Sequence, residues 1–233
     1  MMLLAIDTST RIVGLALYDG AEVCGEMVWM SRANHTVELA PAISQMMSQR
    51  GIAVGNLQAI AVARGPGSFT GLRIGLALAK GIALARRIPL IGVATLDILA
   101  ASQAVCELPL AAVLRAGRGR LAIGWYQVQN GAWCPTGSIE VLTAMELYER
   151  IHQPMLVSGE LTQEERLLLG RKPKSIVLAS PAQSLRRPSF LAELGWRRLS
   201  AGEADDVVTL QPIYLRKPAI TRPRRQFDME ECR

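Results

Sequence analysis

The chain has 233 residues, half of them hydrophobic, so it is long enough to form one large domain or two small ones around an ample core. Its net charge of +6 permits a nucleic-acid partner without establishing one. The four cysteines are scattered without a C-x-x-C pair, which argues against a disulfide scaffold and against a zinc site. No basic-then-apolar leader opens the chain, and its longest apolar stretch, interrupted by Lys80, is too short to span a bilayer, so we expect a soluble cytoplasmic protein.

Apolar runs separated by turn signals predict alternating strands and helices over the first hundred residues. Asp19-Gly20 is a strong two-residue hairpin signal, and Asn34 is a candidate cap for the helix that follows. The expected strands are 2–6, 12–18, 21–30, 57–63 and 90–93, and the expected helices are 36–49, 70–86 and 96–103. This β-β-β-α-β-α-β order is typical of an RNase H-like half.

The rest of the chain repeats this order, and a second hairpin signal, Asn130-Gly131, suggests an internal duplication. The expected strands are 110–114, 121–129, 132–134, 138–142, 155–157 and 175–178, and the expected helices are 144–152, 163–169 and 182–199. Two such halves facing one another form the actin-like (ASKHA) α/β architecture, with mixed sheets flanked by helices. We therefore divide the chain into an N-terminal RNase H-like half, residues 1–103, and a degenerate C-terminal half with a basic tail, residues 104–233.

One glycine-rich stretch, Arg64-Gly65-Pro66-Gly67-Ser68-Phe69-Thr70-Gly71-Leu72-Arg73, joins a predicted strand to the longest predicted helix. The glycines and the proline favour a tight turn, and Ser68 or Thr70 can cap the helix. A capped helix start presents free backbone N–H groups, which is a typical site for an anion. The stretch is neither a Walker A loop nor G-x-G-x-x-G, so a plain strand-to-helix turn without a ligand is an equal alternative.

In an actin-like protein a nucleotide lies between the halves, where the turn Asp7-Thr8-Ser9-Thr10 would meet its phosphates and Asp7 could hold a metal-bound water. The corresponding turn of the second half, residues 115–120, contains no acid, which argues against a complete ATP-hydrolysing site. An RNase H-like nuclease is disfavoured because Arg64 stands where a metal site needs a carboxylate. The residues that we consider for a vestigial or shared nucleotide contact are Asp7, Thr8, Ser9, Gly67 and Ser68.

The two histidines, His35 and His152, form no metal-binding pair, because Leu39 stands four residues after His35. We interpret His35 as a cap or surface residue near the start of the first helix. No catalytic Ser-His-Asp or Cys-His set can be assembled, so no catalytic residue and no metal ligand is predicted.

The helix at 70–86 carries small residues at i, i+4 and i+8, which leaves a smooth stripe where another helix can approach closely. The equal alternative is that this stripe packs against the chain's own sheet. Combined with the Met-rich face of the first helix, it predicts a two-helix docking surface. The residues of this predicted surface are Leu39, Ile43, Met46, Met47, Gly71, Leu72, Gly75, Leu76 and Ala79.

Five segments together resemble the TsaB (YeaZ) family. The match is dense over residues 3–99 and thin beyond, and the Gly-Pro-Gly-Ser-Phe-Thr-Gly-Leu-Arg run is highly specific. The segments are Leu4-Ala5-Ile6-Asp7-Thr8-Ser9-Thr10, Asn34-His35, residues 63–75, Lys80-Gly81 and Pro212-Ile213-Tyr214-Leu215-Arg216.

The resemblance implies a non-catalytic scaffold or activating subunit of the bacterial machinery that makes N6-threonylcarbamoyladenosine at position 37 of tRNA. It implies pairing with the catalytic TsaD subunit through the first two long helices, a TsaE-type ATPase that joins the pair, and homodimers formed through the same surface. It further implies contact with tRNA through the complex and no membrane association. This chain alone would bind no cofactor tightly, and ATP or ADP would lie at the interface of the complex. TsaB proteins lack the two-histidine metal motif of TsaD, and Leu39 agrees with that loss.

The turn of the second half departs from the family pattern. Many members carry Asp-Ala-Arg followed by Gly-Glu-Val-Tyr, whereas this chain carries Arg115-Ala116-Gly117-Arg118-Gly119-Arg120-Leu121.

The competing hypothesis is an autonomous actin-like phosphotransferase or ATPase that binds ATP between residues 7–10 and 65–70. Under the scaffold hypothesis, we expect Gly75→Leu to abolish pairing while the isolated chain still folds.

Overall fold

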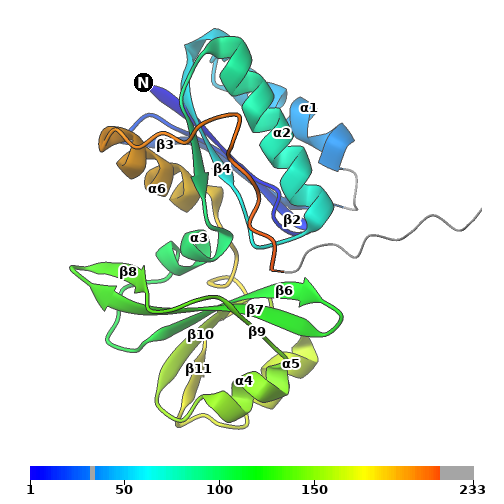
Figure 1. Ribbon diagram of the computed structural model, residues 1–233, viewed down its shortest axis with the longest axis vertical. Coiled ribbons are helices and arrows are strands. Elements are labelled where there is room, and N and C mark those ends of the chain that lie inside the picture. The colour runs from blue at the N-terminus through cyan, green and yellow to red at the C-terminus, as the bar shows by residue number, and fades with distance from the viewer. Residues whose placement is uncertain (32–34, 216–233) are drawn as a thin grey trace, which may run out of the picture.

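The computed structural model describes residues 1–31 and 35–215. The candidate cap Asn34 and the basic tail from residue 216 onward therefore lie outside the described residues. The described chain forms two lobes, each built on one sheet (Figure 1). No helix in the described ranges has both the length and the apolar character needed to cross a membrane.

The first sheet contains the five strands predicted for the first half: β1 Met2–Asp7, β2 Ile12–Tyr18, β3 Val23–Met30, β4 Leu57–Ala63 and β5 Leu90–Val93. Their order is β3-β2-β1-β4-β5. β1 to β3 form an antiparallel meander, and β4 and β5 run parallel to β1. The parallel strands are buried almost throughout, which explains their continuous apolar sequence. The β2–β3 turn is longer than the predicted two residues, because Asp19 accepts hydrogen bonds from the backbone of Ala21 and Glu22.

The second sheet repeats this topology. Its strands are β6 Leu110–Gly117, β7 Arg120–Gln129, β8 Ala132–Pro135, β9 Glu140–Leu142, β10 Met155–Gly159 and β11 Ile176–Leu178. Their order is β11-β10-β6-β7-β8, and β9 pairs with the other end of β7. β8 and β9 together thus take the place that β3 has in the first sheet. The shared strand order confirms the prediction of two RNase H-like halves.

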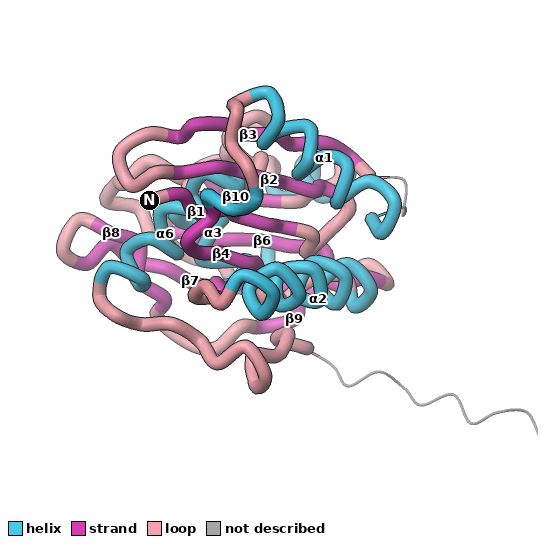
Figure 2. The backbone as a smooth tube through the Cα atoms, turned by 90° about the horizontal axis from the view of Figure 1, so that it is seen from above, coloured by secondary structure: helices cyan, strands magenta, loops and turns pink. Residues whose placement is uncertain are grey.

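Helices cover the faces of both sheets. They are α1 His35–Gln49, α2 Phe69–Arg86, α3 Thr95–Ala101, α4 Ala144–Arg150, α5 Gln163–Leu169 and α6 Pro188–Ser200. α1 and α2 lie on one side of the first sheet and α6 on the other, as both views show (Figures 1 and 2). α4 and α5 cover one face of the second sheet.

Two helices pack across the division of the chain at residue 103. α3 precedes that position, yet Leu96, Leu99 and Ala100 belong to the core of the second sheet. α6 lies in the second half of the sequence, yet Leu191 and Ala192 belong to a core cluster of the first sheet. The predicted division therefore differs from the packing, because each lobe borrows a helix from the other half of the chain.

The start of α6 was predicted six residues too early. The helix begins at Pro188, and Arg187 before it has the extended conformation, with φ −96° and ψ 128°. Proline disfavours helical geometry in the residue before it and is well tolerated in the first turn of a helix. Residues 182–187 are thereby left outside the helix, and this places Arg186 on a loop.

Two glycines of α2 provide a stability test. A Cβ on Gly71 would lie 2.3 Å from the carbonyl oxygen of Thr8, whereas a Cβ on Gly81 meets nothing within 4 Å. We expect Gly71→Ala to lower the free energy of unfolding by about 1–3 kcal/mol through overpacking. Gly81→Ala should raise it by about 0.5–1 kcal/mol, because alanine loses less backbone entropy in a helix. Urea denaturation followed by circular dichroism measures both, and equal effects of the two variants would contradict this packing.

Candidate functional site

The turn after β1 and the turn before α2 are packed directly against each other. The backbone N–H of Ser68 donates to the carbonyl oxygen of Ser9 at 2.6 Å. A Cβ on Gly67 would lie 2.1 Å from that same oxygen, so only glycine fits at this position. Ser68 Oγ accepts a hydrogen bond from Gly71 N at 3.3 Å and caps α2, as the sequence predicts. The start of α2 thus contacts the chain's own backbone.

The hydroxyl groups of the β1 turn are buried and have partners within the chain. Thr8 Oγ1 donates to the carbonyl oxygen of Gly71 at 2.7 Å, and Ser9 Oγ lies 2.8 Å from Thr95 Oγ1. Both side chains are fully buried. The five residues considered for a nucleotide contact are therefore close together. Four of them, Thr8, Ser9, Gly67 and Ser68, contact one another, the backbone of Gly71 or the hydroxyl of Thr95.

Asp7, the fifth residue considered for a nucleotide contact, forms an ion pair with Arg186, which lies 179 positions later in the chain. Arg186 Nε donates to Asp7 Oδ2 at 2.5 Å, and its Nη1 lies 3.0 Å from Glu160 Oε1. Its Nη2 donates to Thr10 Oγ1 at 3.1 Å and to the carbonyl oxygen of Ile12 at 3.3 Å. Thr10 Oγ1 itself donates to Glu160 Oε1 at 2.6 Å. We call Asp7, Thr10, Glu160 and Arg186 the arginine cluster.

The arginine cluster holds the two lobes together. Asp7 ends β1 of the first sheet, Glu160 follows β10 of the second sheet, and Arg186 lies between β11 and α6. The Arg186 side chain is 1% exposed and that of Asp7 is 3% exposed. Burial lowers the pKa of the Arg186 guanidinium, but the adjacent carboxylates of Asp7 and Glu160 outweigh burial and raise it, so the cation is retained.

The arginine cluster decides what this site can do chemically. In an actin-like enzyme Asp7 would face a phosphate or a metal-bound water, and here it faces a guanidinium with fixed geometry. Within the described ranges, no group of three or more His, Cys, Asp or Glu side chains could hold a metal ion. Sequence reasoning missed Arg186 and Glu160, because nothing in their spacing links them to Asp7. Pro188 was the one available signal that Arg186 lies on a loop.

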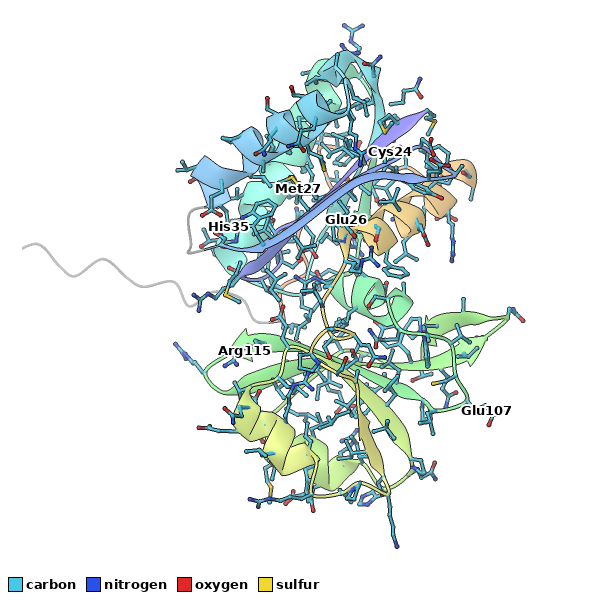
Figure 3. The ribbon with its side chains drawn as sticks, turned by 180° about the vertical axis from the view of Figure 1, so that it is seen from behind. Cys24, Glu26, Met27, His35, Glu107 and Arg115 are labelled. Carbon is cyan, nitrogen blue, oxygen red and sulfur yellow. The ribbon has the colours of Figure 1, made fainter. Side chains whose placement is uncertain are left out.

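His35 is the first residue of α1 and is 8% exposed. Of the two predicted roles, a cap or a surface residue, the surface position is therefore wrong. Its Nε2 atom lies 3.3 Å from the carbonyl oxygen of Thr10. Figure 3 shows the ring beside the strands at the start of α1. His35 therefore fixes the first turn of α1 to the β1 turn.

All nine residues of the predicted docking surface are buried in the chain's own core. The smooth stripe of α2 faces the β1 turn, where a Cβ on Gly75 would lie 2.1 Å from Thr8 Oγ1. For the small-residue stripe of α2, the structure therefore agrees with the alternative of internal packing, and the four α1 residues are buried in the same way. Gly75→Leu would thus disturb the core of the isolated chain, and it cannot serve as a test of pairing.

A cleft of about 520 Å³ lies between the lobes. The start of α2 forms one wall with Phe69, and the β6–β7 hairpin forms the opposite wall with Arg115 and Arg118. Tyr214 and Leu215 line it as well. Figure 3 shows Arg115 at the level where the two lobes meet.

Comparison with known proteins agrees with this architecture. A family model described as TsaD, tRNA N6-adenosine threonylcarbamoyltransferase, matches residues 29–187. The tRNA threonylcarbamoyladenosine biosynthesis protein TsaB of Bacillus subtilis is 34% identical over 93% of this chain and 94% of its own length. YeaZ from Pseudomonas aeruginosa has a TM-score of 0.76 and 28% identity, covering 92% of this chain and 99% of its own.

The wider likeness concerns the fold alone. The ethanolamine utilization protein EutJ from Carboxydothermus hydrogenoformans has a TM-score of 0.51 at 15% identity, covering 84% of this chain and 90% of its own. Together with the two repeated sheets, this likeness defines an actin-like α/β protein. Within that class, the similarity to TsaB over almost the whole length shows that the chain belongs to the TsaB (YeaZ) family.

Proposed function

We propose that this chain is a non-catalytic scaffold subunit of tRNA threonylcarbamoyladenosine biosynthesis and activates a TsaD-type transferase by pairing with it. The observation that carries the proposal is the arginine cluster, in which Arg186 takes the place of a phosphate or a metal beside Asp7. The assignment to tRNA threonylcarbamoyladenosine biosynthesis rests on membership of the TsaB family. The alternative, an autonomous actin-like phosphotransferase or ATPase, finds no support. In such an enzyme Asp7 would have to release the buried guanidinium of Arg186 before it could act on a nucleotide.

We place the docking surface on the outward face of α1 and α2. Ala77, Gly81 and Leu84 recur at i, i+4 and i+7 and lie exposed along one line of α2. Leu84 is 61% exposed, and Val37 of α1 is 72% exposed. We call these four residues the outer face. It replaces the buried residues of the sequence-based prediction, on the same two helices.

The proposed occupant of the outer face is the TsaD-type subunit. The TsaD family model matches more than half of this chain, which supports packing between two related folds. In this proposal a second copy of the chain uses the same face when the transferase is absent. A TsaE-type ATPase and tRNA join the pair in the cytoplasm, and any ATP or ADP binds at the interface of the complex and not beside Asp7.

The stoichiometry of the reconstituted reaction tests this function. With the TsaD-type subunit, the ATPase, activated threonylcarbamoyl donor and tRNA held constant, product formation should rise in proportion to added chain and level off at one chain per transferase. A separate enzyme would act at a small fraction of that ratio. Full activity at substoichiometric amounts, or turnover of ATP by the isolated chain, would contradict a scaffold role.

A further inference from the structure

We propose that the cleft between the lobes binds a nucleotide of single-stranded RNA, with the phosphate on the β6–β7 hairpin and the base against an aromatic wall. This inference deepens the proposed function, since it gives the chain a direct contact with the RNA substrate. The cleft volume of about 520 Å³ lies within the usual range of ligand sites.

The cations of the cleft lack local compensation. Arg115, Arg118 and Arg120 line it, and no Asp or Glu does so among the described residues. Arg120 pairs with Glu146 at 3.5 Å, but both side chains are substantially exposed, so the pair is weak. Arg115 and Arg118 are exposed and form no ion pair with residues in the described ranges. Free guanidinium groups on a hairpin suit the phosphates of a nucleic-acid backbone.

The opposite wall of the cleft is aromatic and held in place. The rings of Phe69 and Tyr214 lie 5.1 Å apart at an interplanar angle of 37°. The Arg73 guanidinium lies 3.9 Å from the centre of the Phe69 ring, and its Nε donates to Tyr214 Oη at 3.1 Å. Proteins that bind single-stranded nucleic acid combine a cationic groove for the backbone with aromatic side chains on which bases stack. Paired bases in a duplex could not reach this wall.

The residue at position 118 is not the one that the geometry of the hairpin turn favours. Arg118 and Gly119 have φ of 52° and 68°, and Asn130 and Gly131, in the next hairpin, have φ of 52° and 76°. Both are two-residue turns with positive φ, which favour Asn-Gly. The second hairpin follows that preference, whereas the first has an arginine at the position where asparagine is preferred. The turn geometry therefore does not account for Arg118.

This contrast supplies the test variant. Arg118→Asn introduces the residue that this turn prefers, so the variant should fold at least as stably as the native chain. Combined with Arg115→Gln, it removes two cations from the cleft. The matched control, Arg171→Gln with Arg197→Gln, removes the same charge from exposed positions outside the cleft.

The measurement is fluorescence anisotropy of a labelled eight-nucleotide single-stranded RNA titrated with the full chain over a range of salt concentrations. Loss of both cleft arginines should weaken binding and flatten the slope of log affinity against log salt by about 1.4, because each lost phosphate contact removes about 0.7. Tyr214→Ala should weaken binding roughly tenfold with an unchanged slope, since stacking releases no counterions. The control pair should leave both quantities near the native values.

The proposal is overturned by no RNA binding, by equal losses in the cleft and control variants, by displacement with free AMP as effective as with RNA, or by equal binding of duplex RNA. A truncated chain that ends at residue 215 separates the contribution of the basic tail to RNA binding from that of the cleft. Binding that disappears with the tail and ignores the cleft substitutions would also overturn it. Pairing of each variant with the TsaD-type subunit is measured alongside, so failure of the RNA site is distinguished from failure of the proposed function.

Discussion

Arg186→Met should lower the free energy of unfolding by about 3–5 kcal/mol, the range for breaking a buried ion pair by removing one partner. Methionine fills a similar volume but leaves the buried carboxylates of Asp7 and Glu160 without their cation. The hydrogen bond to the carbonyl oxygen of Ile12 is lost as well. Urea denaturation monitored by circular dichroism gives the value.

The neighbouring Arg187 is the matched control. It pairs with Glu26 at 2.5 Å, but its side chain is 54% exposed. Arg187→Met should therefore cost no more than about 1 kcal/mol. Adding Asp7→Asn to Arg186→Met should recover part of the loss, because one uncompensated charge is removed. A loss below 1 kcal/mol for Arg186→Met would show that the arginine cluster does not hold the lobes together.

Leu84→Arg should weaken pairing with the TsaD-type subunit on the order of a hundredfold, because it places an unpaired charge in an apolar interface. Leu167→Arg on α5 is the matched control, since Leu167 is a helical leucine with 64% exposure against 61% for Leu84. Both variants should unfold at the same midpoint urea concentration as the unmodified chain, because neither side chain is buried. Isothermal titration calorimetry measures the dissociation constants.

The comparison between these two leucines locates the interface. Unchanged affinity for Leu84→Arg would move the docking surface away from α2. Equal weakening by both variants would indicate a general effect of charge. Only selective loss at Leu84 agrees with the outer face.

Local signals in the sequence predicted most of the fold. Apolar runs bounded by turn signals placed β2, β4 and β5 at their observed bounds, and the Ser68 cap of α2 follows from residues next to one another in the chain. The repeated order of elements gave the two halves. Each of these features depends on interactions within a few residues or on a pattern of burial.

The chemistry of the site depends on contacts that no local pattern contains. Arg186 is 179 positions from Asp7, and their pairing follows only from the folded arrangement of both lobes. The stripe of small residues on α2 was ambiguous for the same reason. A smooth helix face fits a partner helix or the chain's own β1 turn equally well, and the position of Thr8 decides for the latter.

The most direct test of the scaffold function is light scattering on a sizing column, with this chain alone, the TsaD-type subunit of the same organism alone, and an equimolar mixture. We expect the mixture to elute as a new species whose mass equals one copy of each chain, with no nucleotide required beside Asp7. Separate elution of the two proteins at micromolar concentration, with and without ATP, would contradict the proposal that this chain functions by pairing with the transferase.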